Sequence, residues 1–391
     1  MKPIIPVTRP QLPSLASLMP LLEQIWDSRQ LTNGGPLHQR FEQALADYLG
    51  VEHLSLFANG TLALMAALRA HTDRDTRGRD QVITTPYSFV ATAHAVRWNQ
   101  LTPVFVDIDP VTLNLDPSCV EAAITERTTA ILAVHCYGRR CDTAALQALA
   151  DHYQLRLIYD AAHAFAIRDA GGSLLRHGDC SVLSLHATKV FNTFEGGAIV
   201  STSAAAKQQI DRLRNFGFVD ETRVASVGIN AKMPEFNAAI GLLQLPAIDQ
   251  ALAARARVAA AYRQALATFD GLEPLLPLAG QNENNGYFPI RVGAAFPLSR
   301  DALYEHLRAQ GIHARRYFYP LICNLEAYRT GAGSRHPLPN ANLIAEQVLC
   351  LPIYPDLAAD DFERVIAALG TAHASHRNAR PCLIPDPSDA R

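Results

Sequence analysis

The segment Ser184-Leu185-His186-Ala187-Thr188-Lys189 is the most informative part of this sequence, and it is followed shortly by Phe191-Asn192-Thr193-Phe194-Glu195-Gly196-Gly197. An apolar run, Cys180–Leu185, comes shortly before the lysine, and the next charged residue is Glu195. A lysine that is desolvated in such surroundings has a lowered pKa and can act as a nucleophile toward carbonyl groups. The alternative is that Lys189 is an ordinary solvated lysine.

Short apolar runs rich in β-branched residues recur on both sides of this stretch, and segments that can be helical lie between several of them. Alternating strands and helices predict an α/β fold, in which helices cover both faces of a mostly parallel sheet. Ligands bind at the carboxyl ends of such strands, so functional residues are expected there. The predicted strands are His53–Ala58, Gln81–Thr85, Pro103–Ile108, Thr129–Cys136, Leu155–Tyr159, Cys180–Leu185 and Gly197–Thr202, and the predicted helices are Thr61–Arg69, Ser88–Trp98, Pro117–Ile124 and Thr143–Tyr153.

The sequence changes in character near residue 265. A long helix is predicted over Pro234–Leu266, interrupted or bent near Pro246. After it, Tyr287–Val292 has the pattern of a strand and Asp301–Gln310 that of a helix. These patterns predict a second, smaller α/β domain. The predicted units are a large domain over 1–265 that includes the N-terminal segment, a small C-terminal domain over 266–376, and a loose tail over 377–391.

Composition and charge exclude several classes of protein. The 391 residues are 49% hydrophobic and 18% charged, which is enough apolar material for a sizeable core. A net charge of −2 leaves no basic excess for binding nucleic acid. No apolar run approaches the roughly 18 residues that span a membrane, and the proline-rich start lacks a signal segment. The 7 scattered cysteines, with no Cys-x-x-Cys pair, indicate reduced thiols and a cytoplasmic protein.

A phosphate-binding turn is a candidate at Asn59-Gly60-Thr61, between a predicted strand and a predicted helix. The N-terminus of a helix presents unpaired backbone N–H groups and a partial positive charge, and both attract phosphate. Gly60 permits close approach, and Thr61 adds a hydroxyl donor. The alternative is a simple turn with a helix cap.

A carboxylate candidate is found in Tyr159-Asp160-Ala161-Ala162-His163. Asp160 follows the predicted strand Leu155–Tyr159 and therefore lies at its carboxyl end. A half-buried carboxylate there needs a cationic partner. Helix capping or a structural salt bridge is the alternative role for Asp160, and His163 on its own is more often structural.

The usual nucleotide and metal motifs are absent from the sequence. There is no Gly-x-Gly-x-x-Gly after the first predicted strand, no Walker-type glycine loop and no His-Glu-x-x-His. His177-Gly178-Asp179-Cys180 is better explained as a turn that leads into the next strand than as a metal site. No metal is therefore expected.

The candidate motifs are most informative in combination. They offer a phosphate cradle, a carboxylate and a lysine flanked by hydroxyl groups, each next to the carboxyl end of a predicted strand. Pyridoxal phosphate needs the same set: a lysine for its aldehyde, an acid for its pyridine nitrogen and a site for its phosphate.

The sequence resembles the DegT-type sugar-nucleotide aminotransferases, which are pyridoxal-phosphate enzymes of the aspartate-aminotransferase fold, fold type I. The similarity runs from about Leu31 to Pro355. The stretches that carry it are Thr32-Asn33-Gly34-Gly35-Pro36, Asn59-Gly60-Thr61, Thr85-Pro86-Tyr87-Ser88-Phe89-Val90-Ala91-Thr92, Asp160-Ala161-Ala162-His163, Ser184-Leu185-His186-Ala187-Thr188-Lys189, Glu195-Gly196-Gly197 and Asn230-Ala231-Lys232-Met233, which continues into Glu235–Leu245.

The resemblance implies a role for each catalytic residue. Lys189 would bind the cofactor covalently and then carry a proton between cofactor and substrate carbons. Asp160 would keep the pyridine nitrogen protonated. His163 would lie near the phenolic oxygen of the cofactor, although many relatives have Gln at this position.

The resemblance also implies how the cofactor and a partner subunit are arranged. Phe89 would stack on the cofactor ring. Gly60, Thr61 and Ser184 would bind the phosphate. Asn230 would reach the phosphate from the partner subunit, which implies a homodimer with shared active sites.

The implied reaction moves an amino group from an amino acid, L-glutamate, to a keto group of a nucleotide-linked sugar. The variant motifs look most like those of enzymes that aminate C4 of dTDP-4-keto-6-deoxyglucose. Amination of C3, a cofactor-binding regulator without turnover, and a non-enzymatic α/β binding module are the alternatives. The candidate substrate-binding residues are Asn33, His186, Arg315, Arg316 and Tyr317, and Arg214 and Lys232 are further cations that could line the approach of a nucleotide.

Overall fold

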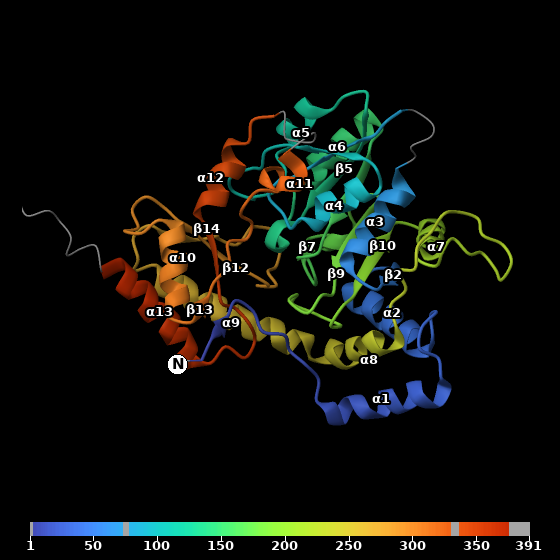
Figure 1. Ribbon diagram of the computed structural model, residues 1–391, viewed down its shortest axis with the longest axis horizontal. Coiled ribbons are helices and arrows are strands. Elements are labelled where there is room, and N and C mark those ends of the chain that lie inside the picture. Colours follow the sequence, from blue (N-terminus) through green and yellow to red (C-terminus); the bar gives the residue numbers. More distant parts are fainter. Residues whose placement is uncertain (1–2, 73–77, 330–335, 375–391) are drawn as a thin grey trace, which may run out of the picture.

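The computed structural model describes residues 3–72, 78–329 and 336–374, and a seven-stranded sheet forms its centre (Figure 1). The strand order is β2-β10-β9-β6-β5-β3-β4. Every strand is parallel to the others except β10, which is antiparallel to both of its neighbours. The mostly parallel α/β sheet is therefore confirmed. Its strands are β2 (His53–Phe57), β3 (Gln81–Thr84), β4 (Thr102–Phe105), β5 (Thr128–Val134), β6 (Arg156–Asp160), β9 (Cys180–Ser184) and β10 (Gly197–Ser201).

Helices cover both faces of this sheet because its strands are apolar on both sides. Neighbouring residues of one strand enter different clusters: Val82 packs with the helix α3 (Gly60–His71), and Ile83 packs with α5 (Pro117–Ala123) and α6 (Thr143–Tyr153). This alternation is the period of two expected of a pleated strand. The other helices around the sheet are α2 (Pro36–Leu49), α4 (Ala91–Trp98), α7 (Ala204–Leu213) and α8 (Glu235–Gln244).

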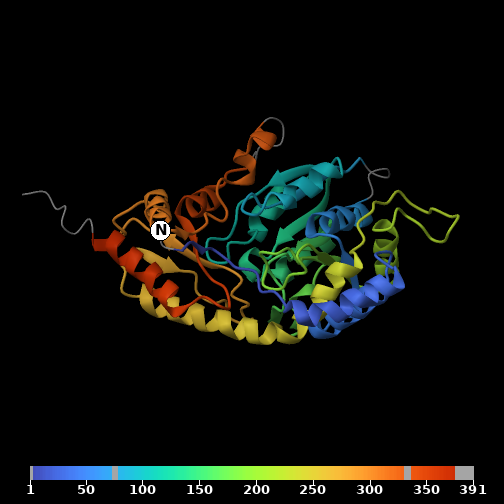
Figure 2. The same ribbon diagram turned by 60° about the horizontal axis from the view of Figure 1, so that its bottom comes forward.

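The predicted interruption of the long helix near Pro246 is confirmed. Helix α8 ends at Gln244, the 3-10 turn η3 (Leu245–Ala247) follows, and α9 (Ile248–Leu266) continues in nearly the same direction (Figure 2). Proline has no backbone N–H and cannot complete the hydrogen-bond ladder of a helix, which explains the break. Helix α9 passes from the core beside α8 to a second core, where its residues Ala259 and Tyr262 are buried.

The second core surrounds a three-stranded antiparallel sheet of order β11-β12-β14. Helix α10 (Arg300–Ala309) confirms the predicted helix, and β12 confirms the predicted strand one residue shorter. Leu272–Pro274 forms a strand within a stretch that has the composition of turns. The strands are β11 (Leu272–Pro274), β12 (Phe288–Val292) and β14 (Val348–Leu351), and the remaining elements of this part are β13 (Ile312–His313), η4 (Ile322–Asn324), α11 (Glu326–Arg329), α12 (Pro339–Gln347) and α13 (Ala359–Ala374).

The first residues of the chain lie with this second core. Strand β1 (Ile5–Pro6) pairs in parallel with β13, and Ile5 is fully buried among the side chains of the second core. The predicted large domain over 1–265 grouped this segment with the central sheet, whereas the pairing joins it to the later residues. The other domain boundaries stay predictions, and the predicted tail over 377–391 lies outside the described residues.

Helix α1 (Leu15–Ser28) lies along the outer side of α8, with Leu18 and Ile25 buried against the core. Leu15, Met19 and Trp26 of the same helix are exposed. None of the helices in the described ranges is long and apolar enough to cross a membrane. The remaining short elements are β7 (Arg168–Asp169), β8 (Gly172–Ser173), η1 (Cys136–Gly138) and η2 (Leu174–Arg176).

Candidate active site

A cleft of about 610 Å³ opens at the carboxyl ends of β6 and β9. This is the edge of a parallel sheet where ligands are expected to bind. Asn230 is the one predicted cofactor residue that does not line it. The predicted catalytic and cofactor residues that do line it are Gly60, Thr61, Phe89, Asp160, His163, Ser184 and Lys189.

The turn before α3 has the geometry of a helix cap and of an anion cradle. Asn59 caps the helix, because its Oδ1 accepts a hydrogen bond from the backbone N–H of Leu62 at 2.8 Å. A Cβ atom at Gly60 would lie 3.0 Å from Cβ of Ser184, so a side chain here would crowd the strand end. The N–H groups of Gly60 and Thr61 belong to the first turn, where no intrahelical carbonyl accepts them.

Gly197 closes the row of strand ends beside this turn. It is the first residue of β10, and it pairs with Phe57 on one side and Ser184 on the other. A Cβ atom at Gly197 would lie 2.6 Å from the backbone carbonyl of Asn59. A larger residue would therefore displace the candidate phosphate turn.

Asp160 is the last residue of β6 and is 5% exposed. Its Oδ2 accepts a hydrogen bond from the Thr92 hydroxyl at 2.7 Å, and its Oδ1 accepts one from the Ala162 N–H at 3.1 Å. Burial raises the pKa of Asp160, while these hydrogen bonds and the charge of Lys189 partly lower it. No Lys, Arg or His of the described residues forms an ion pair with this carboxylate. A buried carboxylate of this kind is matched by a cationic ligand nitrogen.

His163 is held as a neutral ring. Its Nδ1 accepts a hydrogen bond from the backbone N–H of Tyr137 at 3.1 Å, which assigns the ring proton to Nε2. Burial and the nearby charge of Lys189 keep the pKa of His163 well below its ordinary value. The neutral imidazole therefore offers one N–H donor, and the residue lines the cleft.

Lys189 lies between these groups and the opposite wall of the cleft. Its Nζ donates a hydrogen bond to the hydroxyl of Tyr287 at 3.1 Å. Burial lowers the pKa of Lys189 to about 8, although the Asp160 carboxylate raises it in part. At pH 7 about one tenth of the amine is therefore neutral, far more than for an ordinary lysine, and a neutral amine is nucleophilic.

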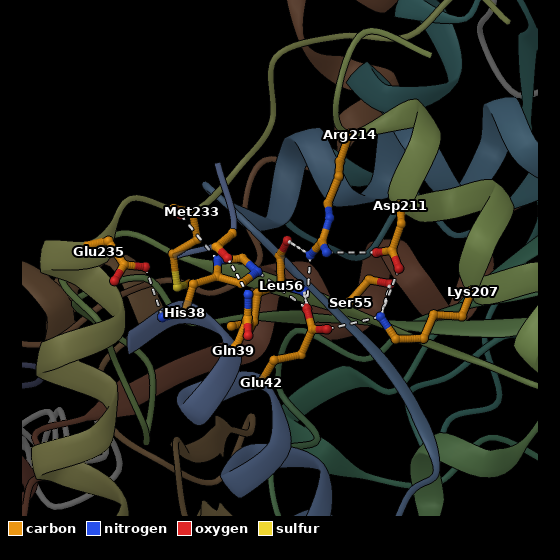
Figure 3. Close-up of polar contacts among 11 residues, drawn as sticks. His38, Gln39, Glu42, Ser55, Leu56, Lys207, Asp211, Arg214, Met233 and Glu235 are labelled. Carbon is orange, nitrogen blue, oxygen red and sulfur yellow. Dashed lines mark hydrogen bonds and ion pairs between the residues drawn. The ribbon is translucent and has the colours of Figure 1, made fainter. Parts of the chain in front are cut away.

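A partly buried ion network adjoins β2, the strand that leads into the candidate phosphate turn (Figure 3). Glu42 Oε2 accepts hydrogen bonds from Arg214 Nη1 at 2.9 Å and from the Leu56 N–H at 3.0 Å. Arg214 Nη1 also donates to the Leu56 carbonyl at 2.7 Å. Lys207 Nζ donates to Glu42 Oε1 at 2.9 Å. The network therefore ties helices α2 and α7 to β2.

The same network sets the position of the segment that carries Asn230. The carbonyl of Arg214 accepts the N–H of Ala231 at 2.9 Å, and the carbonyl of Ala231 accepts the N–H of Ala58 at 2.8 Å. Asn230 itself is exposed and bridges to Asn215. The segment is thus anchored next to the turn, while Asn230 itself is exposed and does not line the cleft.

The predicted substrate-binding residues divide into two groups. His186 and Tyr317 line the cleft. Arg316 is instead paired with Asp301 at 2.8 Å, and Asn33 and Arg315 are exposed outside the cleft lining. Of the two further cations, the guanidinium of Arg214 is engaged by Glu42, and Lys232 donates to Asn215 Oδ1 at 3.0 Å.

The turn that leads into β9 behaves as a structural element. His177 Nε2 lies 3.0 Å from Asp169 Oδ2, and Asp179 Oδ2 accepts the Leu157 N–H at 2.8 Å. Throughout the described ranges, no group of three or more His, Cys, Asp and Glu side chains is arranged to hold a metal ion.

Residues 16–370 match the model of the DegT/DnrJ/EryC1/StrS aminotransferase family. The chain belongs to this family. The expected family membership and fold are therefore confirmed.

Two curated relatives are similar over nearly their whole length. A dTDP-4-amino-4,6-dideoxy-D-glucose transaminase of Shigella dysenteriae is 52% identical over 94% of this chain and 98% of its own. A protein of the same name from Escherichia coli is 48% identical over 90% of this chain and 94% of its own. The solved structure of DesI in the presence of its TDP-sugar product has 38% identity and a TM-score of 0.89, and the match covers 97% of this chain and 95% of that one.

Two residues of this aminotransferase site were not found from the sequence. Thr92 bonds Asp160, and it in turn accepts a hydrogen bond from Ser88 at 2.9 Å. Ser88 lies in the bend before α4 and Thr92 in its first turn, so the bend that leads into the helix, and not a helical spacing, brings the two hydroxyls together. Tyr287, by contrast, comes from the second sheet, and no local pattern connects it with Lys189.

Proposed function

We propose that this chain is a pyridoxal-phosphate-dependent aminotransferase that transfers an amino group from L-glutamate to C4 of dTDP-4-keto-6-deoxy-D-glucose. The observation that carries the proposal is the lysine of the cleft, Lys189, opposite the buried carboxylate of Asp160, in a chain 52% identical to a transaminase named for that sugar. The sugar and the donor both belong to the proposal.

The residues of the cleft fit pyridoxal phosphate at each of its functional groups. The first turn of α3, with Ser184 beside it, suits the phosphate. Asp160, buried without a cationic side chain in ion-pair contact among the described residues, suits a protonated pyridine nitrogen. The neutral His163 can donate to a phenolic oxygen. Phe89, which is 59% exposed in the cleft wall, suits stacking on a ring.

The chemistry divides between the cofactor and the chain. Pyridoxal phosphate, when bound, supplies an aldehyde that condenses with amines and a ring that withdraws electrons from the adjacent carbon. Lys189 would hold the aldehyde through Nζ. As a free amine, Nζ would take a proton from the donor carbon and return one to the cofactor, and in the second half-reaction it would deliver a proton to C4 of the sugar. Asp160 would keep the ring nitrogen protonated, which favours loss of a proton from the carbon beside the bound nitrogen.

A homodimer with shared active sites is part of the proposal. Asn230 is exposed and lies outside the cleft of its own subunit. The loop between Asn215 and Asn230 projects from the molecule beside α7 (Figure 1) and exposes Phe216, Val224 and Val227. Exposed apolar residues of this kind are typical of the large interfaces of obligate dimers. The partner's loop would thus bring Asn230 to the phosphate.

A cytoplasmic location is also proposed. Its support is that the six cysteines within the described residues form no disulfide: Cys119, Cys136, Cys141, Cys180, Cys323 and Cys350.

The decisive experiment is to incubate the purified protein with L-glutamate and a panel of keto-sugar nucleotides. The panel contains dTDP-4-keto-6-deoxyglucose, its 3-keto isomer and a GDP-linked 4-keto sugar, and mass spectrometry and NMR identify each product. We expect amination of the dTDP-linked 4-keto sugar, with the new amine on C4. Preference for the 3-keto isomer would contradict the proposed sugar position, and preference for the GDP sugar would contradict the proposed nucleotide.

The main functional alternative is a regulator that binds the cofactor without turnover. A single-turnover experiment with L-glutamate separates the two functions, because an aminotransferase converts the aldehyde form of the cofactor to the amine form and a regulator need not. The conversion is followed by absorbance. A protein that binds no pyridoxal phosphate at all would instead be a binding module of another kind.

A further inference from the structure

The hydrogen bond between Lys189 and Tyr287 joins the two sheets of the molecule across the cleft. Lys189 follows β9 of the large sheet, and Tyr287 immediately precedes β12 of the small one. The Tyr287 hydroxyl lies 3.1 Å from Nζ, and Nζ has no other hydrogen-bond partner among the described residues. The reactive amine is thus oriented by one side chain from the opposite wall.

Tyr287 is held rigidly in this position. Asn284, which is 2% exposed, donates from Nδ2 to the carbonyls of His163 and Phe165, both at 2.9 Å. Asn284 Oδ1 accepts the N–H of Gly286 at 3.0 Å, directly before Tyr287. Asn284 therefore fixes Tyr287 relative to the segment that follows Asp160. Because Tyr287 orients the Lys189 amine, the amine is also positioned relative to the Asp160 carboxylate.

Ring contacts complete this arrangement. The Tyr287 ring packs against the rings of His163 at 4.7 Å, Tyr137 at 5.6 Å and Tyr317 at 5.9 Å. Burial raises the pKa of Tyr287 far above its ordinary value, so the phenol stays protonated. Its oxygen can therefore accept one hydrogen bond from the amine while the hydroxyl remains neutral.

The single hydrogen-bond acceptor beside Nζ, the Tyr287 oxygen, limits the directions in which the lone pair of the amine can point. A neutral amine has two N–H groups and one lone pair, and the lone pair must point at the proton that it removes. When one N–H is fixed on the Tyr287 oxygen, rotation about the Cε–Nζ bond is restricted and the lone pair has few remaining directions. Holding a reacting group in its productive orientation lowers the activation barrier and so increases the rate.

We propose that Tyr287 is a positioning residue that holds the Lys189 amine in place for proton transfer. This inference rests on the proposed aminotransferase function. Among the described residues, no other side chain forms a hydrogen bond with Nζ of Lys189. Tyr137, which packs beside Tyr287, bonds Tyr87 and the backbone of Tyr317 instead.

The variant that tests the proposal is Tyr287→Phe, which keeps the ring and removes only the hydroxyl. Tyr262→Phe is the matched control, because Tyr262 is a fully buried tyrosine whose hydroxyl has no partner in the described structure and which lies in the second core. Both variants are compared with wild type by circular dichroism and by cofactor affinity, and we expect these two properties to be unchanged.

The first measurement uses protein from which the cofactor has been removed. Labelling of Lys189 by acetic anhydride is followed against pH by mass spectrometry of its peptide. We expect half-maximal reactivity near pH 8 in wild type and in Tyr262→Phe. In Tyr287→Phe we expect it about half a unit to one unit lower, because a charged ammonium loses a stronger hydrogen bond than a neutral amine does.

The second measurement is the single-turnover reaction of the holoenzyme with L-glutamate, unlabelled and deuterated at Cα. We expect Tyr287→Phe to be slower by about 10- to 100-fold, with a larger deuterium isotope effect, because proton transfer becomes the slow step. We expect Tyr262→Phe to behave as wild type.

The outcomes separate this inference from the proposed function. If wild type converts glutamate and Tyr287→Phe matches it in rate and isotope effect, the inference is overturned while the function stands, whatever the labelling shows. If wild type converts no donor, the proposed function fails and the positioning role of Tyr287 fails with it. In that case the labelling curve still decides whether Tyr287 controls the protonation of Lys189.

Discussion

The hydroxyl of Thr92 donates a hydrogen bond to Oδ2 of Asp160 across 2.7 Å, deep in the wall of the cleft. Because Thr92 uses its proton in this bond, the hydrogen bond between Thr92 and Ser88 must be donated by Ser88. Ser88 thus orients the Thr92 hydroxyl, and the Thr92 hydrogen bond partly offsets the effect of burial, which raises the pKa of Asp160.

Replacement of Thr92 by Val tests this relationship. The variant has a similar shape and lacks the donor, so the pKa of Asp160 is expected to rise further. We expect a loss of about 10-fold in the rate of the half-reaction with glutamate, and a shift of the acidic limb of the rate–pH profile to higher pH. Thr92→Ser keeps the hydroxyl and should restore both properties. A Val variant with an unshifted profile would contradict this role of Thr92.

Replacement of Asp160 by Asn removes the charge and keeps the size. The amide cannot stabilise a protonated ring nitrogen, so we expect the protein to fold and bind cofactor but to react with glutamate about 100- to 1,000-fold more slowly. Stopped-flow absorbance measures this rate. A rate equal to that of wild type would make Asp160 a structural residue.

Replacement of Lys189 by Ala should abolish turnover and leave cofactor binding measurable. The phosphate turn, Asp160 and His163 remain in place, because none of them depends on the lysine for its backbone hydrogen bonds. Equilibrium dialysis measures binding, and product analysis measures turnover. Turnover like that of wild type would refute the assignment of Lys189.

Replacement of Glu42 by Gln tests the ion network of Figure 3. Burial by itself would raise the pKa of Glu42, but His38, Arg214, Lys207 and the Leu56 amide together lower it well below its ordinary value. The ionised carboxylate therefore stabilises the fold above the unfolded-state pKa, and this contribution declines as the pH falls below about 4.5.

We expect Glu42→Gln to lower the free energy of unfolding at pH 7 by about 1–3 kcal/mol, because Arg214 and Lys207 lose one of the two carboxylates that they share and keep only Asp211. Chemical denaturation measures this difference, which should shrink at pH 4. Asp361→Asn, which breaks the partly exposed pair with Arg364, is the control and should change stability by less than about 1 kcal/mol. An effect of Glu42→Gln that does not depend on pH would argue against the charge interaction.

The shared active site is tested by mixing two inactive variants, Lys189→Ala and Asn230→Asp. A carboxylate at 230 would face the cofactor phosphate, and like charges repel, so this variant should bind cofactor weakly. If the sites are shared, a mixed dimer collects both lesions in one site and leaves the other intact. We expect partial recovery of activity after subunit exchange. No recovery in dimers that mass spectrometry proves to be mixed would refute the role proposed for Asn230.

The parts of the site that follow strand ends could be predicted from the sequence. Gly60, Asp160 and Lys189 each come shortly after an apolar run, and the carboxyl ends of parallel strands meet at one edge. The local sequence pattern and the parallel topology are therefore enough to predict that these residues share one cleft. A mostly parallel, mixed sheet is the expectation, but the sequence does not indicate that β10 is the strand that runs in reverse, because an apolar run carries no information about its direction.

Other features depend on contacts between distant segments. Tyr287 is 98 residues from Lys189 and comes from another sheet, so only the packing of the two sheets reveals their contact. The pairing of β1 with β13 is equally remote in sequence. Helix α1 was missed for a local reason, since Pro20 lies inside it and a proline usually ends a helix.

Strand β10 begins where its neighbour β9 ends, and this has a consequence for the tolerance of the chain to insertions. The segment with Lys189 is closed at its base, because the Leu185 N–H bonds the Gly196 carbonyl at 2.8 Å. The loop that carries Lys189 therefore consists of the residues between Leu185 and Gly196, and its conformational entropy depends on their number. Insertions between β6 and β9, or after β10, would lengthen other loops and leave the reach of Lys189 unchanged, whereas a single residue added within the loop would alter it.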